Sequence, residues 1–220
     1  FNYSAFDRYV ELMMRAGIKE SILCVSMVDG PGHSPDCDIG YKDTSSGLFR
    51  IRHTEVGDPL YRQAWNIFLP AFVAHLKEKG WLNKTYIAFD EKPQEIMNTI
   101  LEVLKGSAPE LKISLSGGSS SQRSAKADEL TVYIDDLANR ENMAKLLTAR
   151  RQVGPTMFYT ACAPALPNTF LYSPLYESRL LPWIAWQNGL NGYLRWAYQS
   201  WPDQVWRQPL YRWHSADMYF

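Results

Sequence analysis

Two neighbouring acidic residues follow directly after a short apolar segment near the middle of the chain. Residues 85–89 read Thr-Tyr-Ile-Ala-Phe, and Asp90 and Glu91 come next. Paired carboxylates are the groups that glycosidic bond cleavage requires, because one protonates the leaving oxygen while the other stabilises a cation-like transition state. Adjacent residues in a strand point to opposite sides. The two carboxylates can therefore act together only if the strand ends there and the backbone turns.

The same pair also fits a structural role. Lys92 and Pro93 follow it, and a helix is predicted to begin there, so Asp90 or Glu91 could be an N-cap that interacts favourably with the helix dipole. Lys92 is interpreted as a solvated surface residue. The residues alone do not decide between the catalytic and the capping interpretation.

The elements that must position this pair alternate regularly along the chain. The alternation predicts parallel strands with right-handed crossovers, and a complete barrel of this kind takes about 250 residues. We therefore predict an α/β fold, a partial (β/α)8 TIM barrel that lacks its first strand or two, with residues 1–220 forming its larger C-terminal part. A doubly wound open sheet is the alternative, although no glycine-rich phosphate loop follows the first strand. Strands are expected at residues 21–28, 85–89, 111–115, 129–134, 157–160 and 192–198, helices at 4–17, 58–80, 93–105, 140–152 and 174–188, and a long loop at 29–57.

Active sites of such barrels lie at the carboxyl ends of the strands. The residues expected there combine carboxylates and aromatic rings with little basic charge, which is typical of a site for neutral sugars. Asp136 and Asn139 can also be interpreted as caps of the following helix. The predicted strand ends carry Asp29, His33, Asp90, Glu91, Ser116, Asp135, Asp136, Tyr159, Thr160, Trp196, Tyr198 and Trp201.

Composition narrows the choice of partners. Lys plus Arg and Asp plus Glu both total 23, so the formal net charge is zero and neither nucleic acid nor an anionic membrane is an expected partner. The histidines form no metal-binding pattern, and neither a metal nor another cofactor is predicted. No apolar run reaches the length of a membrane span, so membrane insertion is not expected. Cys24 and Cys37 are interpreted as free buried thiols rather than as a disulfide, and Cys162 as an unremarkable thiol.

Tryptophan is concentrated at the end of the chain, where six of the eight lie within the last 40 residues. Trp183 and Trp186 fall in a predicted helix, and core packing is the preferred interpretation for them. Flat aromatic faces also stack on the C–H faces of pyranose rings. For one or two of the later tryptophans, we expect such a sugar-binding role.

Two segments of the sequence resemble glycoside hydrolase family 123, which includes β-N-acetylgalactosaminidases. They are TYIAFDEKP at residues 85–93 and FYTACAPALPNTFLYSPLYESRLLPWIAWQNGLNGYLRWAYQSW at residues 158–201. The second segment adds specificity through Glu177, Arg179 and the two helical tryptophans. A structural ion pair is expected for Glu177 and Arg179.

The resemblance implies a retaining, substrate-assisted mechanism, the exception to the scheme of two enzymic carboxylates. The 2-acetamido oxygen of the substrate would attack the anomeric carbon and form an oxazolinium intermediate. Glu91 would be the acid and then the base, and Asp90 would hold the acetamido N–H. Barrel position further suggests Tyr159, Trp196, Asp135 and Trp201 as substrate-binding residues.

Three further expectations concern the whole protein. The substrate would be a glycan or glycoconjugate, the barrel would pack against an N-terminal domain outside this chain, and the location would be secreted or periplasmic. Two alternatives stay open. One is a non-catalytic carbohydrate-binding barrel, and the other is a double displacement that pairs Glu91 with Asp135 or Asp136.

Overall fold

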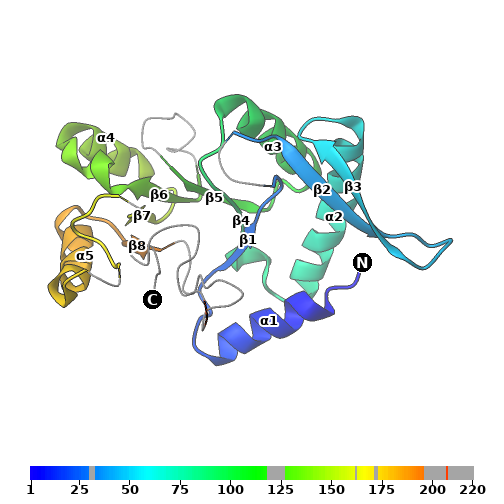
Figure 1. Cartoon of the computed structure of the whole chain (residues 1–220), viewed down its shortest axis with the longest axis horizontal. Helices are drawn as coiled ribbons and strands as arrows, with labels where there is room; N and C mark the ends of the chain where they lie inside the picture. The colour runs from blue at the N-terminus through cyan, green and yellow to red at the C-terminus, as the bar shows by residue number, and fades with distance from the viewer. Residues whose placement is uncertain (30–32, 118–126, 162, 171–172, 196–206, 208–220) are drawn as a thin grey trace. The chain divides into compact units, whose positions relative to one another are not determined.

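The structure is a computed structural model that describes residues 1–29, 33–117, 127–161, 163–170, 173–195 and 207. The chain divides into two compact units, residues 1–115 and 116–220. Each unit is built of parallel strands that alternate with helices, as Figure 1 shows. Of the predicted site residues, Asp90 and Glu91 belong to the first unit, and Asp135 and Tyr159 belong to the second.

The first unit contains three parallel strands in the order β1-β4-β5. The register pairs Ile22 with Thr85 and Val25 with Ala88, so the carboxyl ends of β1 and β4 lie at the same edge. In chain order its elements are α1 (Ser4–Arg15), β1 (Ile22–Val25), β2 (Asp36–Lys42), β3 (Phe49–Glu55), α2 (Pro59–Glu78), η1 (Leu82–Lys84), β4 (Thr85–Phe89), α3 (Gln94–Ser107) and β5 (Lys112–Ser116).

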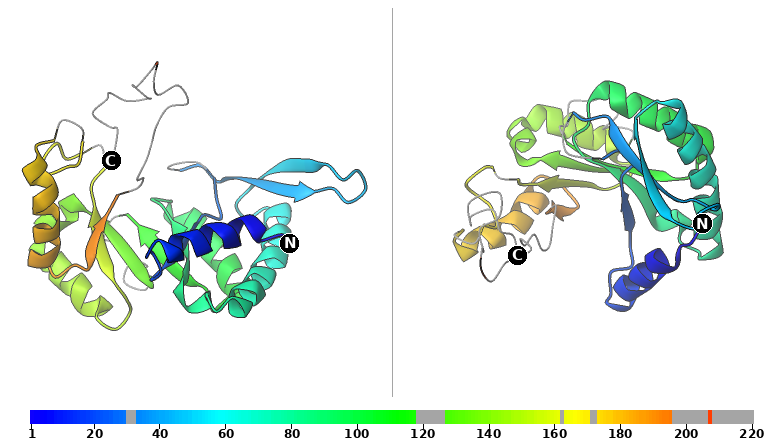
Figure 2. Two further views of the ribbon diagram at one scale, coloured as in Figure 1. Left: turned by 90° about the horizontal axis from the view of Figure 1, so that it is seen from below. Right: turned by 45° about the vertical axis from the view of Figure 1, so that its right-hand side comes forward.

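The predicted long loop at residues 29–57 was wrong. This segment contains β2 and β3, which pair as an antiparallel hairpin that projects from the rest of the unit (Figure 2). Cys37, Ile39 and Tyr41 do alternate with polar residues or glycine along β2, but the surrounding Gly, Pro, Asp and Ser residues favoured a loop. The connecting turn is held by Asp43, whose carboxylate accepts a hydrogen bond from the Ser45 N–H at 2.9 Å, and by Gly47 at a φ of 70°.

The start of α2 is marked by Asp58 and Pro59, which act in different ways. Pro59 is the first helical residue, as expected from its fixed φ. Asp58, however, does not cap the helix with its side chain. Its carboxylate instead accepts hydrogen bonds from the Glu55 N–H at 3.1 Å and from the Thr54 hydroxyl at 3.2 Å, which ties the end of β3 to the helix.

The second unit also contains three parallel strands, in the order β6-β7-β8. Arg150 lies buried at their amino ends and donates to the carbonyls of Ala127 at 2.7 Å and Pro155 at 2.9 Å. The elements are β6 (Glu129–Tyr133), η3 (Ile134–Ala138), α4 (Arg140–Arg150), β7 (Thr156–Tyr159), α5 (Leu175–Gln187) and β8 (Gly192–Leu194).

The predicted α/β class with parallel strands is confirmed. Six parallel strands within the described ranges are compatible with a partial barrel, whereas a full (β/α)8 barrel is not confirmed. No helix in the described part of the chain has the length and apolarity needed to cross a bilayer.

Candidate active site

The Asp90–Glu91 pair lies where β4 stops and the chain turns. Along β4, Thr85, Ile87 and Phe89 are buried, so the strand is anchored in the unit up to its last residue. Both acidic residues that follow are exposed. The Asp90 carboxylate accepts a hydrogen bond from the Glu91 N–H at 2.8 Å, and the Asp90 carbonyl accepts one from the Lys92 N–H at 2.6 Å. The backbone therefore turns at the point where joint action of the two carboxylates requires it.

The capping interpretation of the pair does not hold for α3. The helix begins at Gln94, and its N-cap position is occupied by Pro93 rather than by Asp90 or Glu91. The carboxylates thus belong to a turn that precedes the helix. This leaves the pair without the structural role that competed with catalysis.

Lys92 is not the solvated residue that the sequence suggested. It is half-buried, and its Nζ donates to the Asp29 carbonyl at 3.2 Å. Asp29 lies beyond the carboxyl end of β1, the strand paired with β4. Lys92 therefore ties the turn that carries the acidic pair to the neighbouring strand end.

Tyr159 and Asp135 lie at strand ends of the second unit. Tyr159 closes β7 opposite Tyr133 of β6, and the two rings are 5.2 Å apart with an interplanar angle of 55°. Asp135 is exposed in η3, immediately after β6. The helix α4 is capped by Asn139, whose side chain accepts from the Asn142 N–H at 3.1 Å, so Asp136 is not needed for that role. Trp196 and Trp201 lie outside the described residues.

Beyond β7, a buried polar network holds the following segment. The side chain of Asn168 is fully buried and donates to the carbonyls of Ala161 at 3.1 Å and Pro164 at 2.8 Å. The Asn168 N–H donates to the carboxylate of Glu177 at 2.8 Å, and Thr160 donates to the Asn168 side-chain oxygen at 3.3 Å. Sequence reasoning missed this network, because residues 160, 168 and 177 share no motif or periodicity.

Arg195 joins the same network just after β8. Its guanidinium donates to the Thr160 carbonyl at 2.8 Å and lies over the Phe170 ring at 5.7 Å. The hydroxyls of Thr160 and Tyr193 are 2.6 Å apart. Of this network, sequence reasoning had singled out only Thr160, as a strand-end residue, and Glu177, as part of the family segment.

Two predictions for α5 were wrong. Glu177 is 1% exposed and binds Asn168, whereas Arg179 is exposed, so the expected ion pair between them is not formed. Trp183 and Trp186 are 65% and 75% exposed rather than packed in the core. The helix buries Glu177, Leu181 and Ala185 instead. Because α5 is apolar on more than one side, its sequence pattern could not identify the buried stripe.

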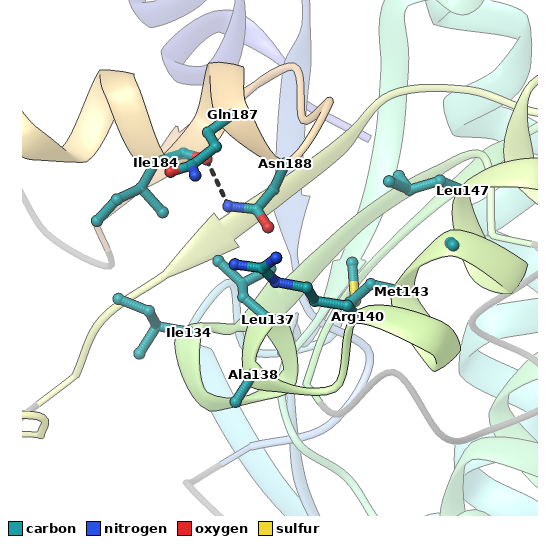
Figure 3. A pocket seen from close by; sticks show the side chains of 10 residues that line it. Ile134, Leu137, Ala138, Arg140, Met143, Leu147, Ile184, Gln187 and Asn188 are labelled. Carbon is teal, nitrogen blue, oxygen red and sulfur yellow. Dashed lines mark hydrogen bonds between the residues drawn. The ribbon is translucent and has the colours of Figure 1, made fainter.

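A cavity of about 590 Å³ lies among η3, α4 and α5 of the second unit (Figure 3). Arg140, Gln187 and Asn188 contribute its polar groups, and the Asn188 amide donates to the Ile184 carbonyl at 2.8 Å. Among the described residues, no carboxylate and none of the predicted site residues lines it. This cavity therefore lacks the acid and base groups of a glycosidase site.

The described residues form no group of three or more His, Cys, Asp or Glu that could hold a metal ion. Cys24 and Cys37 are free thiols, and burial raises the pKa of each to about 11. Neither thiol is therefore ionised to a useful extent near neutral pH, and neither is an activated nucleophile. Cys162 lies outside the described residues.

The model of the family "Glycoside hydrolase 123, catalytic domain" matches residues 1–220. The chain belongs to glycoside hydrolase family 123. No curated protein matches the sequence. A family 123 glycoside hydrolase from Clostridium perfringens, whose structure was analysed for the details of glycolipid glycan hydrolysis, superposes with a TM-score of 0.83 at 24% identity. The alignment covers 100% of this chain and 40% of that protein, and it supports a shared fold.

Proposed function

We propose that this family 123 domain is a retaining glycoside hydrolase that removes terminal β-linked N-acetylhexosamine, specifically N-acetylgalactosamine, by substrate-assisted catalysis. The observation that carries the proposal is the pair Asp90 and Glu91 at the turn after β4, where neither residue serves as the N-cap of α3. Family membership supports the reaction class. The link between the Clostridium perfringens enzyme and glycolipid glycan hydrolysis supports a glycoconjugate substrate.

The adjacency of the two carboxylates favours this mechanism over double displacement. An enzymic nucleophile and a separate acid must flank the scissile bond, with carboxyl groups about 5–5.5 Å apart. The side chains of two successive residues in a turn do not flank a bond in this way. They suit a mechanism in which one acts at the leaving oxygen and the other at a substituent of the same sugar. Glu91 is assigned to the leaving oxygen, and Asp90 is assigned to the 2-acetamido group.

The reaction proceeds in two steps. The acetamido oxygen attacks the anomeric carbon while Glu91 donates its proton to the leaving oxygen, and Asp90 accepts a hydrogen bond from the acetamido N–H as positive charge develops there. Glu91 then removes a proton from water, which attacks the anomeric carbon of the oxazolinium ion. Two inversions restore the original anomeric configuration. Tyr159, Trp196, Asp135 and Trp201 are proposed to bind the sugar.

The proposal extends to the whole protein, which we expect to be secreted or periplasmic. We also propose that the barrel packs against an N-terminal domain. Both expectations derive from the family resemblance.

Two aryl substrates test the mechanism. An aryl β-N-acetylgalactosaminide should be hydrolysed by the full-length protein with retention, which NMR observes directly in the first-formed sugar. The matched aryl β-galactoside has a hydroxyl in place of the acetamido group and should not be turned over, because it carries no internal nucleophile. Equal hydrolysis of both would support double displacement with Asp135 or Asp136. Glycan binding without turnover of either would support a non-catalytic barrel.

A further inference from the structure

The β2–β3 hairpin has two chemically different sides. The register pairs Asp36 with Glu55 and Asp38 with His53, so these four side chains share one side. The opposite side carries Cys37, which is buried, and Tyr41, which lines a cavity with Trp65 and Phe68 of α2. Cys37, Ile39 and Tyr41 therefore alternate along the side nearer α2, and Asp38 and Gly40 of the same strand also line this cavity. We call the other side, with Asp36, Asp38, Lys42, Phe49, Ile51, His53 and Glu55, the ribbon face.

The base of the ribbon is tied to the turn that carries Asp90 and Glu91. Lys92 donates to the Asp29 carbonyl at 3.2 Å. The Asp29 N–H donates to the Asp36 carbonyl at 2.7 Å, and the Asp29 carboxylate accepts from the Asp38 N–H. One residue, Asp29, thus joins the proposed catalytic turn to the first strand of the ribbon. The ribbon begins at the edge of the sheet where the acid pair lies and extends away from it.

An exposed aromatic ring lies on the ribbon face near the tip of the hairpin, where Phe49 pairs with Lys42. A Cβ placed on Gly40 would stand 2.7 Å from Cζ of Phe49, so the ring reaches across the strand into space that only glycine leaves open. Phe49 is 70% exposed. On this face, Ile51 is the cross-strand partner of Gly40, and Asp38 is the preceding residue of the same strand. The ring therefore offers an open aromatic surface on the same side of the hairpin as the carboxylates.

The polar groups of the ribbon face are held in place rather than loose. The Nδ1 atom of His53 is 3.0 Å from the Asp38 carboxylate, and its Nε2 atom is 3.4 Å from the Asp36 carboxylate. The side chains of all three remain more than half exposed. Carboxylate oxygens accept hydrogen bonds from sugar hydroxyls, and an aromatic ring packs against the C–H face of a sugar. The combination suits a hydroxyl-rich ligand with one apolar face.

We propose that the ribbon face binds the neutral glycan on the leaving-group side of the scissile bond, an inference that rests on the proposed function. If the enzyme removes a terminal sugar, the remainder of the glycan lies on the leaving-group side. The ribbon extends from the turn that would hold the terminal sugar. Three carboxylates share the ribbon face with Lys42 and His53, so a neutral glycan is favoured over an acidic one.

The test compares two substrates of the full-length protein. One is a neutral oligosaccharide that ends in β-linked N-acetylgalactosamine, and the other is the aryl glycoside of the same terminal sugar. The quantity measured is the ratio of kcat/KM for the oligosaccharide to kcat/KM for the aryl glycoside. We expect Phe49→Ala to lower this ratio about tenfold, chiefly through KM, because an aromatic contact is lost.

Two further variants separate binding from folding. Gly40→Val fills the space under the Phe49 ring while leaving every polar group, and it should lower the ratio as Phe49→Ala does. Tyr9→Ala, which removes an aromatic side chain that is 63% exposed on α1, is the matched control and should leave the ratio unchanged.

Each remaining outcome decides the question. If Phe49→Ala and Gly40→Val leave the ratio unchanged, the inference is overturned. This holds even if kcat/KM falls by the same factor for the oligosaccharide and for the aryl glycoside. Failure of the wild-type protein to hydrolyse the aryl glycoside refutes the proposed function instead. The ribbon face is then judged by calorimetry with the oligosaccharide, where equal affinity of wild type and Phe49→Ala overturns it.

Discussion

Two strand ends of this domain use polar residues in opposite ways. After β4, Asp90 and Glu91 are exposed. After β7, Thr160, Asn168 and Glu177 are almost fully buried and bind one another or nearby carbonyls. Both ends are rich in groups that could do chemistry. They differ in whether those groups are accessible to a substrate.

The difference distinguishes polar groups that can bind a substrate from polar groups that hold the protein's own loops in place. A buried polar side chain must be hydrogen-bonded, since an unsatisfied one costs about 1–3 kcal/mol, and Asn168 uses both ends of its amide in this way. An exposed carboxylate has no such requirement and can accept a substrate hydrogen bond. This contrast is consistent with the proposed catalytic role of the residues after β4, and it indicates that the buried residues after β7 support the loop.

Replacing Glu91 should produce the largest effect on the reaction. Glu91→Gln keeps the size of the side chain but removes the transferable proton, and general acid–base catalysis contributes about 10²–10⁴-fold. We expect kcat on the aryl N-acetylgalactosaminide to fall by that factor. Because Glu91 is exposed, the urea midpoint should stay close to that of wild type.

Glu95→Gln is the matched control for this variant, since Glu95 is an exposed acid in the first turn of α3. It should leave kcat unchanged. Asp90→Asn should also reduce kcat strongly, because it replaces the charge that stabilises the acetamido group. Full activity of Glu91→Gln would remove Glu91 from the acid role and with it the distinction between the two strand ends.

Asn168→Ala should have the complementary effect at the other strand end. The substitution removes the buried amide that binds the carbonyls of Ala161 and Pro164, of which the Ala161 carbonyl keeps a bond from Arg195 at 3.2 Å. We expect the free energy of unfolding to fall by roughly 2–4 kcal/mol, measured by urea denaturation. Asn188→Ala, which removes a single bond to the Ile184 carbonyl at a half-buried position, should cost less than about 1 kcal/mol. Equal losses would show that the network does not support the loop.

The same contrast explains what could be predicted from sequence. The end of β4 was predictable, because an apolar strand followed by Asp90-Glu91 and a proline is a local pattern. The network after β7 was not, because Thr160, Asn168 and Glu177 meet only through the fold. The β2–β3 ribbon was missed although Cys37, Ile39 and Tyr41 alternate along β2, because the Gly-, Pro-, Asp- and Ser-rich residues around it are typical of a loop.

A smaller effect is expected when the charge of the leaving group is varied. An oligosaccharide with a carboxylated sugar on the leaving-group side should be cleaved less efficiently than the neutral one, because the ribbon face carries Asp36, Asp38 and Glu55. Asp38→Asn should narrow this difference by roughly two- to fivefold at low ionic strength, and about 1 M salt should remove it. Kinetics at two salt concentrations measure this. Salt-independent discrimination would argue against a charge effect and in favour of a steric one.

The smallest effect concerns the titration of His53. The hydrogen bond with Asp38, together with the charges of Asp36 and Glu55, raises the pKa of His53 above its ordinary value. A raised pKa in the folded state means that protonated His53 stabilises the ribbon below its ordinary pKa, and that this contribution is lost as pH rises through the raised value. NMR titration should show a lower pKa in Asp38→Asn than in wild type. An unchanged pKa would mean that Asp38 does not hold His53, and the polar part of the ribbon face would then be less ordered than the exposed carboxylates after β4.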